Sequence, residues 1–225
     1  RQKLWRPKAQ RVAKILEDNA VQISNLIDIG GGHGVFVDEF RDLGDCIPYV
    51  VEPNPDSASR CRKMGIKVFE TFLEDLQVDE LPTGASLFTS FELFEHVHDP
   101  LGWLRSIAKL MKPGDLFVMT TLSSLGLDLR ILWDKSPSIS PPHHINFLNP
   151  GSLTKVAERV GLEIDRVFTP GMLDLDILKN NRHNVHDNFW QSVLDSAKPM
   201  EISRWQTLVS ESNRSSHMWA VLRCR

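Results

Sequence analysis

The sequence contains little cysteine, no membrane-length apolar run and no surplus of positive charge. Its three cysteines, Cys46, Cys61 and Cys224, are widely spaced and form no CxxC pair, which favours isolated reduced thiols over a disulfide framework or a zinc site. No apolar run approaches the ~20 residues that a transmembrane helix needs. The basic N-terminal stretch is followed by no hydrophobic segment, so it is not a secretory signal. These absences predict a cytoplasmic protein without a membrane span.

Charge and length narrow the class further. The formal net charge is −3, whereas proteins that bind a nucleic-acid backbone usually carry a basic surplus, so we expect no nucleic-acid partner. A chain of 225 residues suffices for one sizeable α/β domain but not for two full-sized ones. We therefore expect a single domain over residues 1–225.

Strand-like and helix-like segments alternate along the chain. Short apolar runs predict strands at 25–29, 47–51, 66–69, 85–90, 116–121, 162–168 and 217–222. Amphipathic segments between them predict helices at 8–19, 35–43, 55–64, 100–111 and 150–160. Two of the helix starts carry a capping residue followed by proline, Asp99-Pro100 and Asn149-Pro150. The alternation predicts a doubly wound, mostly parallel sheet of seven strands with helices on both faces.

Residues 171–213 separate the last two predicted strands. They hold two amphipathic segments, at about 189–197 and 202–209, with Phe189, Trp190 and Trp205 at helical spacing. We interpret the segment as a helical cap or insertion of the same domain, or as a subunit interface, which leaves a homodimer open.

A glycine-rich loop follows the first predicted strand, where residues 28–34 read Asp-Ile-Gly-Gly-Gly-His-Gly. A loop with so few Cβ atoms turns tightly and lets a ligand approach the backbone closely. Glu52 ends the second strand, 18 residues after Gly34, where an acid can accept hydrogen bonds from both ribose hydroxyls. Loop and acid together predict a nucleoside site at the carboxyl ends of adjacent strands.

The spacing of the loop indicates which nucleoside binds. The dinucleotide fingerprint requires glycine or alanine at the sixth position of GxGxxG, where this chain has Val35, and the P-loop pattern is absent. The pattern present is an acid, one residue and GxGxG, which resembles the class I S-adenosylmethionine-dependent methyltransferases.

Three further segments are similar to that family. Residues 91–100 resemble the Glu-His-x-x-Asp-Pro segment of small-molecule methyltransferases such as the ubiquinone-pathway O-methyltransferases. Residues 110–114 resemble their Leu-Lys-Pro-Gly turn, and residues 142–150 resemble a His-His-x-x-Phe-x-x-Pro stretch in a branch that includes methyltransferases of glycan gene clusters. The resemblance implies a Rossmann-like fold and S-adenosyl-L-methionine as the cofactor.

The resemblance also implies roles for individual residues. Asp28 and the glycines of the loop would hold the methionine part of the cofactor, and Glu52 would hold the ribose. Phe72 stands where many relatives carry an acid that binds the adenine amine. The full set of cofactor residues implied in this way is Asp28, Gly30, Gly31, Gly32, Gly34, Glu52, Pro53, Phe72, Leu73, Ser90, Phe91 and His96.

Methyl transfer is an in-line displacement in which positioning supplies much of the acceleration, and a hydroxyl acceptor also needs its proton removed. Histidine is suited to that task. His143 and His144 precede the helix that begins at Asn149, where acceptor-lining residues fall in this fold, and His144 ranks before His143 as a base. The histidine pairs are joined by no cysteine and by no HExxH motif, so we expect no metal.

The function that we predict is S-adenosylmethionine-dependent methyl transfer to a hydroxyl of a small metabolite, either a sugar or a quinone-like phenol. Two alternatives stay open at this point. One is a non-catalytic S-adenosylmethionine-binding scaffold or regulatory module, and the other is a nicotinamide-dependent oxidoreductase, against which Val35 counts. The sequence does not identify the acceptor.

Overall fold

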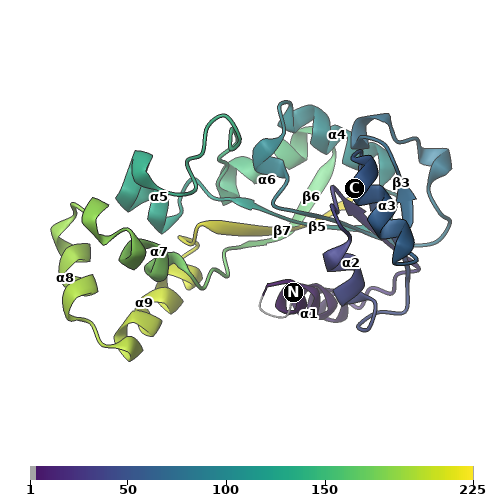
Figure 1. Ribbon diagram of the computed structural model, residues 1–225. Helices are drawn as coiled ribbons and strands as arrows, with labels where there is room; N and C mark the ends of the chain where they lie inside the picture. The colour runs from purple at the N-terminus through teal and green to yellow at the C-terminus, as the bar shows by residue number, and fades with distance from the viewer. Residues whose placement is uncertain (1–3, 225) are drawn as a thin grey trace.

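The computed structural model describes residues 4–224 and contains a seven-stranded sheet with the strand order β3-β2-β1-β4-β5-β7-β6 (Figure 1). The strands are β1 (Asn25–Ile29), β2 (Ile47–Val51), β3 (Lys67–Phe69), β4 (Ser86–Phe91), β5 (Leu116–Leu122), β6 (Leu162–Phe168) and β7 (His217–Cys224). Strand β7 runs antiparallel to both β5 and β6, and the other paired strands are parallel. The predicted mostly parallel, doubly wound sheet is confirmed.

The strand order reverses at β1. From β1 the chain continues to β2 and β3 on one side, and then returns to β4 and β5 on the other side. In open α/β sheets, ligands bind outside the carboxyl ends of the strands at such a reversal. The ends of β1, β2 and β4 therefore mark the place where a binding site is expected.

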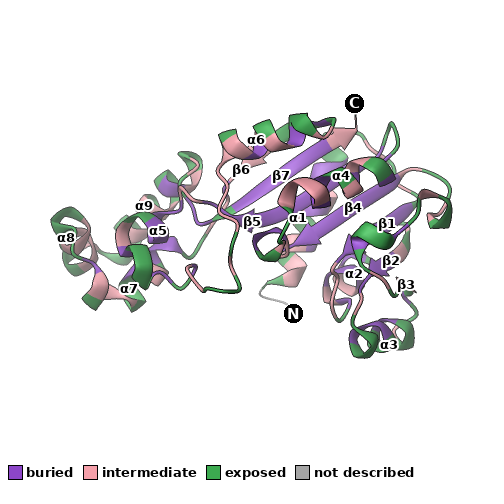
Figure 2. Ribbon diagram, turned by 90° about the horizontal axis from the view of Figure 1, so that it is seen from above, coloured by how far each residue is buried: buried purple, intermediate pink, exposed green. Residues whose placement is uncertain are grey.

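Helices cover both faces of the sheet. They are α1 (Trp5–Asp18), α2 (Val35–Phe40), α3 (Pro55–Lys63), α4 (Pro100–Leu110) and α6 (Pro150–Arg159). Leu26 and Val50 pack in one buried cluster with apolar residues of α1, α2 and α3, whereas Ile27 and Phe88 pack in another with α4 and α6. The central strands β1, β4 and β5 are buried along their whole length (Figure 2), as expected for a parallel sheet with both faces covered, whereas the edge strands β3 and β6 are partly exposed.

The capping residues act as the sequence predicts. The Asp99 side chain accepts a hydrogen bond from the Gly102 amide at 2.9 Å, and the Asn149 side chain accepts one from the Ser152 amide at 3.0 Å. In both helices proline occupies the first turn, where no backbone N–H is needed. These starts fix where α4 and α6 begin.

Four helices form a lobe that extends away from the sheet (Figures 1 and 2). They are α5 (Leu127–Leu132), α7 (Asp174–Asn180), α8 (Asn188–Ser196) and α9 (Pro199–Glu211). The sequence predicted helical segments near α8 and α9 but missed α5 and α7, which are short and have no side-chain N-cap. Leu127, Leu178 and Val209 belong to a separate apolar cluster inside this helical lobe. Short 3-10 turns occupy η1 (Leu73–Asp75), η2 (Val78–Glu80), η3 (Phe94–His96), η4 (Trp133–Lys135) and η5 (Arg182–Asn184).

Two buried aspartates join the helical lobe to the start of β7. Asp174 of α7 accepts hydrogen bonds from the Ser215 hydroxyl at 2.5 Å and from the Ser216 amide at 2.7 Å. Asp128 of α5 accepts from the Ser136 hydroxyl at 2.5 Å and from the hydroxyl of the same Ser216. Buried polar groups hold position only when they are paired, so this network sets how the lobe joins the sheet.

No helix within residues 4–224 is long and apolar enough to cross a membrane.

Candidate active site

The glycine loop after β1 is left-handed at alternate residues. Gly30, Gly32 and Gly34 have φ of +66°, +53° and +70°, a backbone region that favours glycine. At Gly34 an added Cβ would lie 2.7 Å from Ile66 Cδ1, and at Gly31 one would lie 2.7 Å from Asp28 Oδ2. The loop therefore excludes side chains for two reasons, conformation and close packing.

Gly32 differs from its neighbours because its surroundings are open. A Cβ built there meets no atom within 4 Å. The Gly32 amide donates to Glu52 Oε2 at 2.9 Å, and the Asn54 amide donates to Glu52 Oε1 at 2.9 Å, so the loop and the end of β2 share one buried carboxylate. An ionised carboxylate has about four acceptor sites, which leaves capacity for ribose hydroxyls. This cradle fits a nucleoside.

Asp28 lies buried beneath the loop. Its Oδ1 accepts a hydrogen bond from the Thr89 hydroxyl at 2.6 Å. Burial raises the pKa of Asp28 to about 7, although the Thr89 hydrogen bond acts in the opposite direction. A cationic ligand group beside this carboxyl would favour its ionised form, which suits the ammonium of the methionine part of the cofactor.

The end of β4 carries a buried hydroxyl without a hydrogen-bond partner in the described part of the chain. Ser90 is buried, and its hydroxyl is the single buried side-chain N or O atom within residues 4–224 that has no hydrogen-bond partner. Leaving such a group unpaired costs ~1–3 kcal/mol, which a ligand at this edge would recover. Phe91, the next residue, lies in the core, with its ring centroid 4.4 Å from that of Phe36 and 5.8 Å from that of Trp219.

The residues predicted near adenine are placed less uniformly. Leu73 is buried in the core cluster of α4, whereas the Phe72 side chain is 61% exposed. Pro53 is half-buried and follows Glu52 directly. No described contact joins Phe72 to the glycine loop, so its assignment to the adenine site stays a prediction.

Two histidines from distant segments meet beyond β4. The ring centroids of His96 and His144 lie 4.8 Å apart. His96 Nδ1 contacts the His143 carbonyl oxygen at 2.9 Å, and His144 Nδ1 contacts the Ser138 carbonyl oxygen at 2.8 Å. A carbonyl only accepts, so each Nδ1 carries the proton and each Nε2 keeps its lone pair in the neutral ring. The predicted pair His143 and His144 is therefore split: His144 faces His96, and His143 is exposed.

The backbone around Glu95 holds in place the loop that carries His143 and His144, which we call the histidine segment. The Glu95 carbonyl accepts hydrogen bonds from the amides of Ile145 at 2.8 Å and Asn146 at 3.1 Å. The Asn146 side chain donates to the Phe94 carbonyl at 3.1 Å and also to that of Val97. The loop after β5 is thus bound directly to the segment that follows β4.

Glu92, Lys8 and His217 form a charged cluster at the same edge that was not predicted from the sequence. Glu92, with φ +52°, accepts hydrogen bonds from Thr120 at 2.6 Å, from Lys8 at 3.3 Å and from His217 Nδ1 at 3.0 Å. Burial alone would raise the pKa of Glu92, but the His217 and Thr120 hydrogen bonds and the charges of His217 and Lys8 outweigh it and lower that pKa to about 2. The Glu92 hydrogen bond raises the pKa of His217, which favours an ion pair between the two side chains.

The positions of the cluster residues explain why the sequence gives no signal for it. Glu92 and His217 are 125 residues apart. Within residues 4–224 no group of three histidine, cysteine, aspartate or glutamate side chains is arranged to hold a metal ion. The site brings together a nucleoside cradle, a buried acid and two imidazoles at one edge of the sheet.

Comparison with known proteins agrees with this geometry. A family model described as a methyltransferase domain matches residues 1–167. The chain is 25% identical over 167 residues to the ubiquinone biosynthesis O-methyltransferase of Aliivibrio fischeri, covering 68% of this chain and 70% of that protein. It is 27% identical over 165 residues to the enzyme of the same name from Colwellia psychrerythraea, covering 69% and 67%.

Solved structures show the same fold. An S-adenosylmethionine-dependent methyltransferase from Clostridium acetobutylicum aligns with a TM-score of 0.63 at 8% identity, covering 98% of this chain and 92% of that one. The geranyl diphosphate C-methyltransferase of Streptomyces coelicolor aligns with a TM-score of 0.62 at 14% identity, covering 96% and 77%. At these identities the likeness concerns the fold alone.

Proposed function

Because the chain belongs to the methyltransferase domain family and is a class I S-adenosylmethionine-dependent methyltransferase, we propose that its acceptor is a hydroxyl of a small metabolite, a sugar or a quinone-like phenol. The similar proteins from Aliivibrio and Colwellia are named as O-methyltransferases, which supports oxygen as the methylated atom. Family membership favours this function over a scaffold and over a nicotinamide-dependent oxidoreductase. The cytoplasmic location, the single domain and the homodimer stay predictions.

The cofactor would be held by the cradle at the ends of β1 and β2. Asp28 and the loop glycines would hold the methionine part, Glu52 would accept from the ribose, and the unpaired Ser90 hydroxyl would face the reacting end. When bound, S-adenosylmethionine supplies an electrophilic methyl group on a positively charged sulfur. Burial of Asp28 and Glu52 keeps water from competing for their acceptor oxygens.

The observation that carries the choice of a hydroxyl is the orientation of His144. Its Nδ1–H is committed to the Ser138 carbonyl, so Nε2 is free to accept a proton. A hydroxyl becomes a better nucleophile as its proton moves to such a base, a contribution of typically ~10²–10⁴ in rate. We assign His144 as the base, His96 as the residue that packs beside it, and no proton transfer to the exposed His143.

Residues that precede and follow the two histidines in the chain help to line a small cavity. It has a volume of about 210 Å³ and is lined by Ser124, Leu129, Arg130, Trp133, Ile139 and Phe147. Ser124 follows β5, and Ile139 and Phe147 lie on either side of His144 in the chain. Its lining is mainly apolar, and its size is below the ~300–1,000 Å³ of pockets for drug-sized ligands, so it suits one ring of a small metabolite.

The test is a search for the methylated product. The protein is incubated with S-adenosylmethionine that carries a ¹³C-methyl group and with fractionated metabolite extract, and the product is identified by its mass gain and by the chemical shift of the labelled carbon. We expect a methyl ether. A labelled N-methyl or C-methyl product, or label only in macromolecules, would contradict the proposal. Gly32→Val protein, in which the cofactor cradle is filled, serves as the blank.

A further inference from the structure

Two arginines from separate elements converge on one aromatic ring. The Arg166 Cζ of β6 lies 4.6 Å from the centroid of the Phe168 ring. The Arg11 Cζ of α1 lies 5.9 Å from the same centroid and 5.4 Å from the centroid of the Trp219 ring. At these distances the ring faces attract the guanidinium groups, and this contact does not occupy their N–H donors.

Strand register explains this convergence. Phe168 of β6 pairs with Trp219 of β7, and Arg166 lies two residues before Phe168, on the same face of the strand. Phe168 and Trp219 pack against the apolar cluster of α1, so this is the face that α1 covers. Arg11 therefore reaches the pair from the helix while Arg166 rises from the sheet.

Neither arginine has an acidic partner among residues 4–224, where every ion pair of 4.0 Å or less involves other residues. The nearby Asp18 is bound by Lys14 at 2.8 Å. Burial, and then the charge of Arg166, lower the pKa of Arg11, as expected when like charges are close. Two neighbouring cations that form no ion pair among the described residues make a site that favours an anion.

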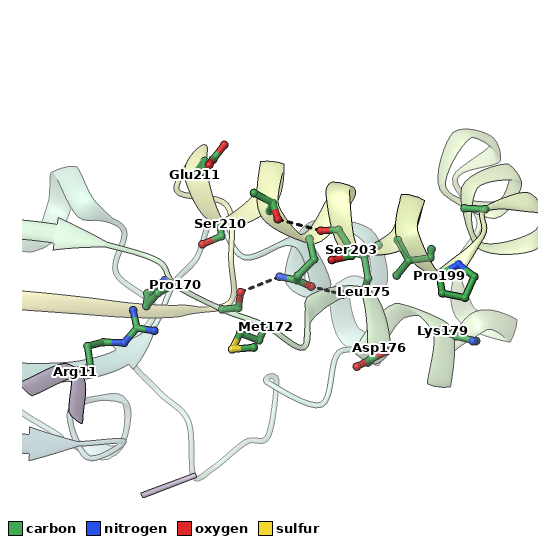
Figure 3. A pocket seen from close by; sticks show the side chains of 15 residues that line it. Arg11, Pro170, Met172, Leu175, Asp176, Lys179, Pro199, Ser203, Ser210 and Glu211 are labelled. Atoms are coloured by element: carbon green, nitrogen blue, oxygen red, sulfur yellow. Dashed lines mark hydrogen bonds between the residues drawn. The ribbon is translucent and has the colours of Figure 1, made fainter. Parts of the chain in front are cut away.

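Two clefts meet at these arginines. One, of about 730 Å³, lies between α1 and the helical lobe, and the other, of about 760 Å³, lies between α1 and the end of β6. Both are lined by Arg11, Pro170, Ser210 and Glu211, and the second also by Arg166. Figure 3 shows Arg11 entering the first cleft beside Pro170, with Ser210 and Glu211 of α9 on its wall. The space is large enough for a metabolite.

We propose that Arg11 and Arg166 bind the phosphate group of a ligand in these joined clefts. Planar guanidinium groups match phosphate oxygens in pairs, and a dianion relieves the repulsion between the two arginines. Glu211 also lines both clefts, but it forms no ion pair of 4.0 Å or less with either arginine. The ligand is either a phosphate-bearing methyl acceptor, which rests on the proposed function, or a separate phosphate compound.

The strand register also gives the distance that an acceptor would have to span between the end of β4 and the two arginines. Phe91, Thr120, Trp219 and Phe168 are successive partners across β4, β5, β7 and β6. Three strand spacings of ~4.8 Å separate the end of β4 from Phe168, roughly 14 Å in all. An acceptor that uses both places would carry its phosphate about that far from the hydroxyl, past His217, which is exposed at the same edge.

Calorimetric titration with pyrophosphate, in the presence of saturating S-adenosylhomocysteine, tests the site without any methyl transfer. We expect wild-type binding that weakens about tenfold in Arg11→Gln and in Arg166→Gln, and about a hundredfold in the double variant. Arg204→Gln, which changes an exposed arginine of α9 outside both clefts, should bind as wild type does. Absence of binding by the folded wild type, or equal binding by the folded double variant, would overturn the proposal.

Lysine variants separate recognition from folding. Arg11→Lys and Arg166→Lys keep the charge but lose the paired N–H geometry, so we expect affinity between those of wild type and the glutamine variants. Phosphatase treatment of the metabolite fraction then distinguishes the two sources. Loss of methyl transfer by wild type after treatment identifies a phosphorylated acceptor, and unchanged transfer with intact pyrophosphate binding identifies a separate ligand.

Discussion

The sheet and the helical lobe are stabilised by different kinds of contact. The sheet is enclosed by two apolar clusters, and its covering helices α4 and α6 begin at side-chain caps. The lobe has a smaller apolar cluster, joins β7 through the buried carboxylates of Asp128 and Asp174, and exposes large apolar side chains such as Met172, Met200 and Leu208. We therefore expect the helical lobe to open locally more readily than the sheet, because extensive apolar burial resists local unfolding more than a hydrogen-bonded connection with an exposed apolar surface does.

The cofactor cradle and the proposed acceptor site also come from different segments of the chain. The cofactor cradle comes from the ends of β1, β2 and β4, within the sheet. The candidate base and the small cavity come from residues 123–148, which run from β5 past α5 to α6. Cofactor binding and acceptor chemistry should therefore respond separately to substitution, and the following predictions test that separation.

The largest effect is expected at His144. Replacement by alanine removes the proposed base, so turnover should fall by ~10²–10⁴ while the affinity for S-adenosylhomocysteine stays within about twofold. Single-turnover rates and calorimetry measure the two quantities. His143→Ala is the matched control, because its side chain is exposed, and it should retain most activity. Equal loss in both variants would indicate that the segment is structural.

Gly32→Val should weaken cofactor binding, in contrast to the change at His144. The branched side chain would fill the open space at Gly32 that the cofactor needs, so cofactor affinity should fall by roughly a hundredfold, or about 3 kcal/mol, and its resistance to the φ of +53° should in addition lower stability by ~1–3 kcal/mol. Gly65→Val is the control, since Gly65 has φ +72° and equally open surroundings at the end of α3. It should lower stability without changing affinity. Unchanged affinity in folded Gly32→Val would place the cofactor elsewhere.

Cofactor affinity should also depend on the ionisation of Asp28. Its pKa is about 7, so the carboxyl is mostly neutral at pH 6 and mostly charged at pH 8. Only the charged form attracts an ammonium, so affinity for S-adenosylhomocysteine should rise about tenfold between these values. Calorimetry of Asp28→Asn provides the comparison, because the variant should lose the pH dependence. A wild-type affinity that falls as pH rises would contradict the assignment.

The smallest effect on cofactor affinity is expected from a substitution at Asp174, where the helical lobe joins β7. Asp174→Ala leaves the buried hydroxyl of Ser215 and the amide of Ser216 without their acceptor, at ~1–3 kcal/mol for each group. Hydrogen exchange should accelerate in α7 and α9 and stay unchanged in β1 and β4, with cofactor affinity unaltered. Asp176→Ala, on the exposed side of the same helix, should change neither. Loss of cofactor binding in Asp174→Ala would show that the two regions are coupled.

Local patterns explain how much of the fold could be predicted. The predicted strands agree with the observed ones within two residues, because buried strands are continuous apolar runs bounded by turn residues. The starts of α4 and α6 were predicted because capping is decided by adjacent residues. Helices α5 and α7 carry no such cap, and their stability comes from packing against each other and α9, which no local pattern records.

By itself, the sequence determined the alternating sheet and placed the glycine loop and Glu52 at one edge, because parallel strands present their carboxyl ends together. The roles of the individual site residues stay predictions. Only the tertiary structure decided that His144, rather than His143, faces His96, that Glu92 pairs with His217, and that two arginines flank Phe168. These contacts join segments far apart in the chain, and their formation depends on how helices and loops pack on the sheet, which residue spacing does not specify.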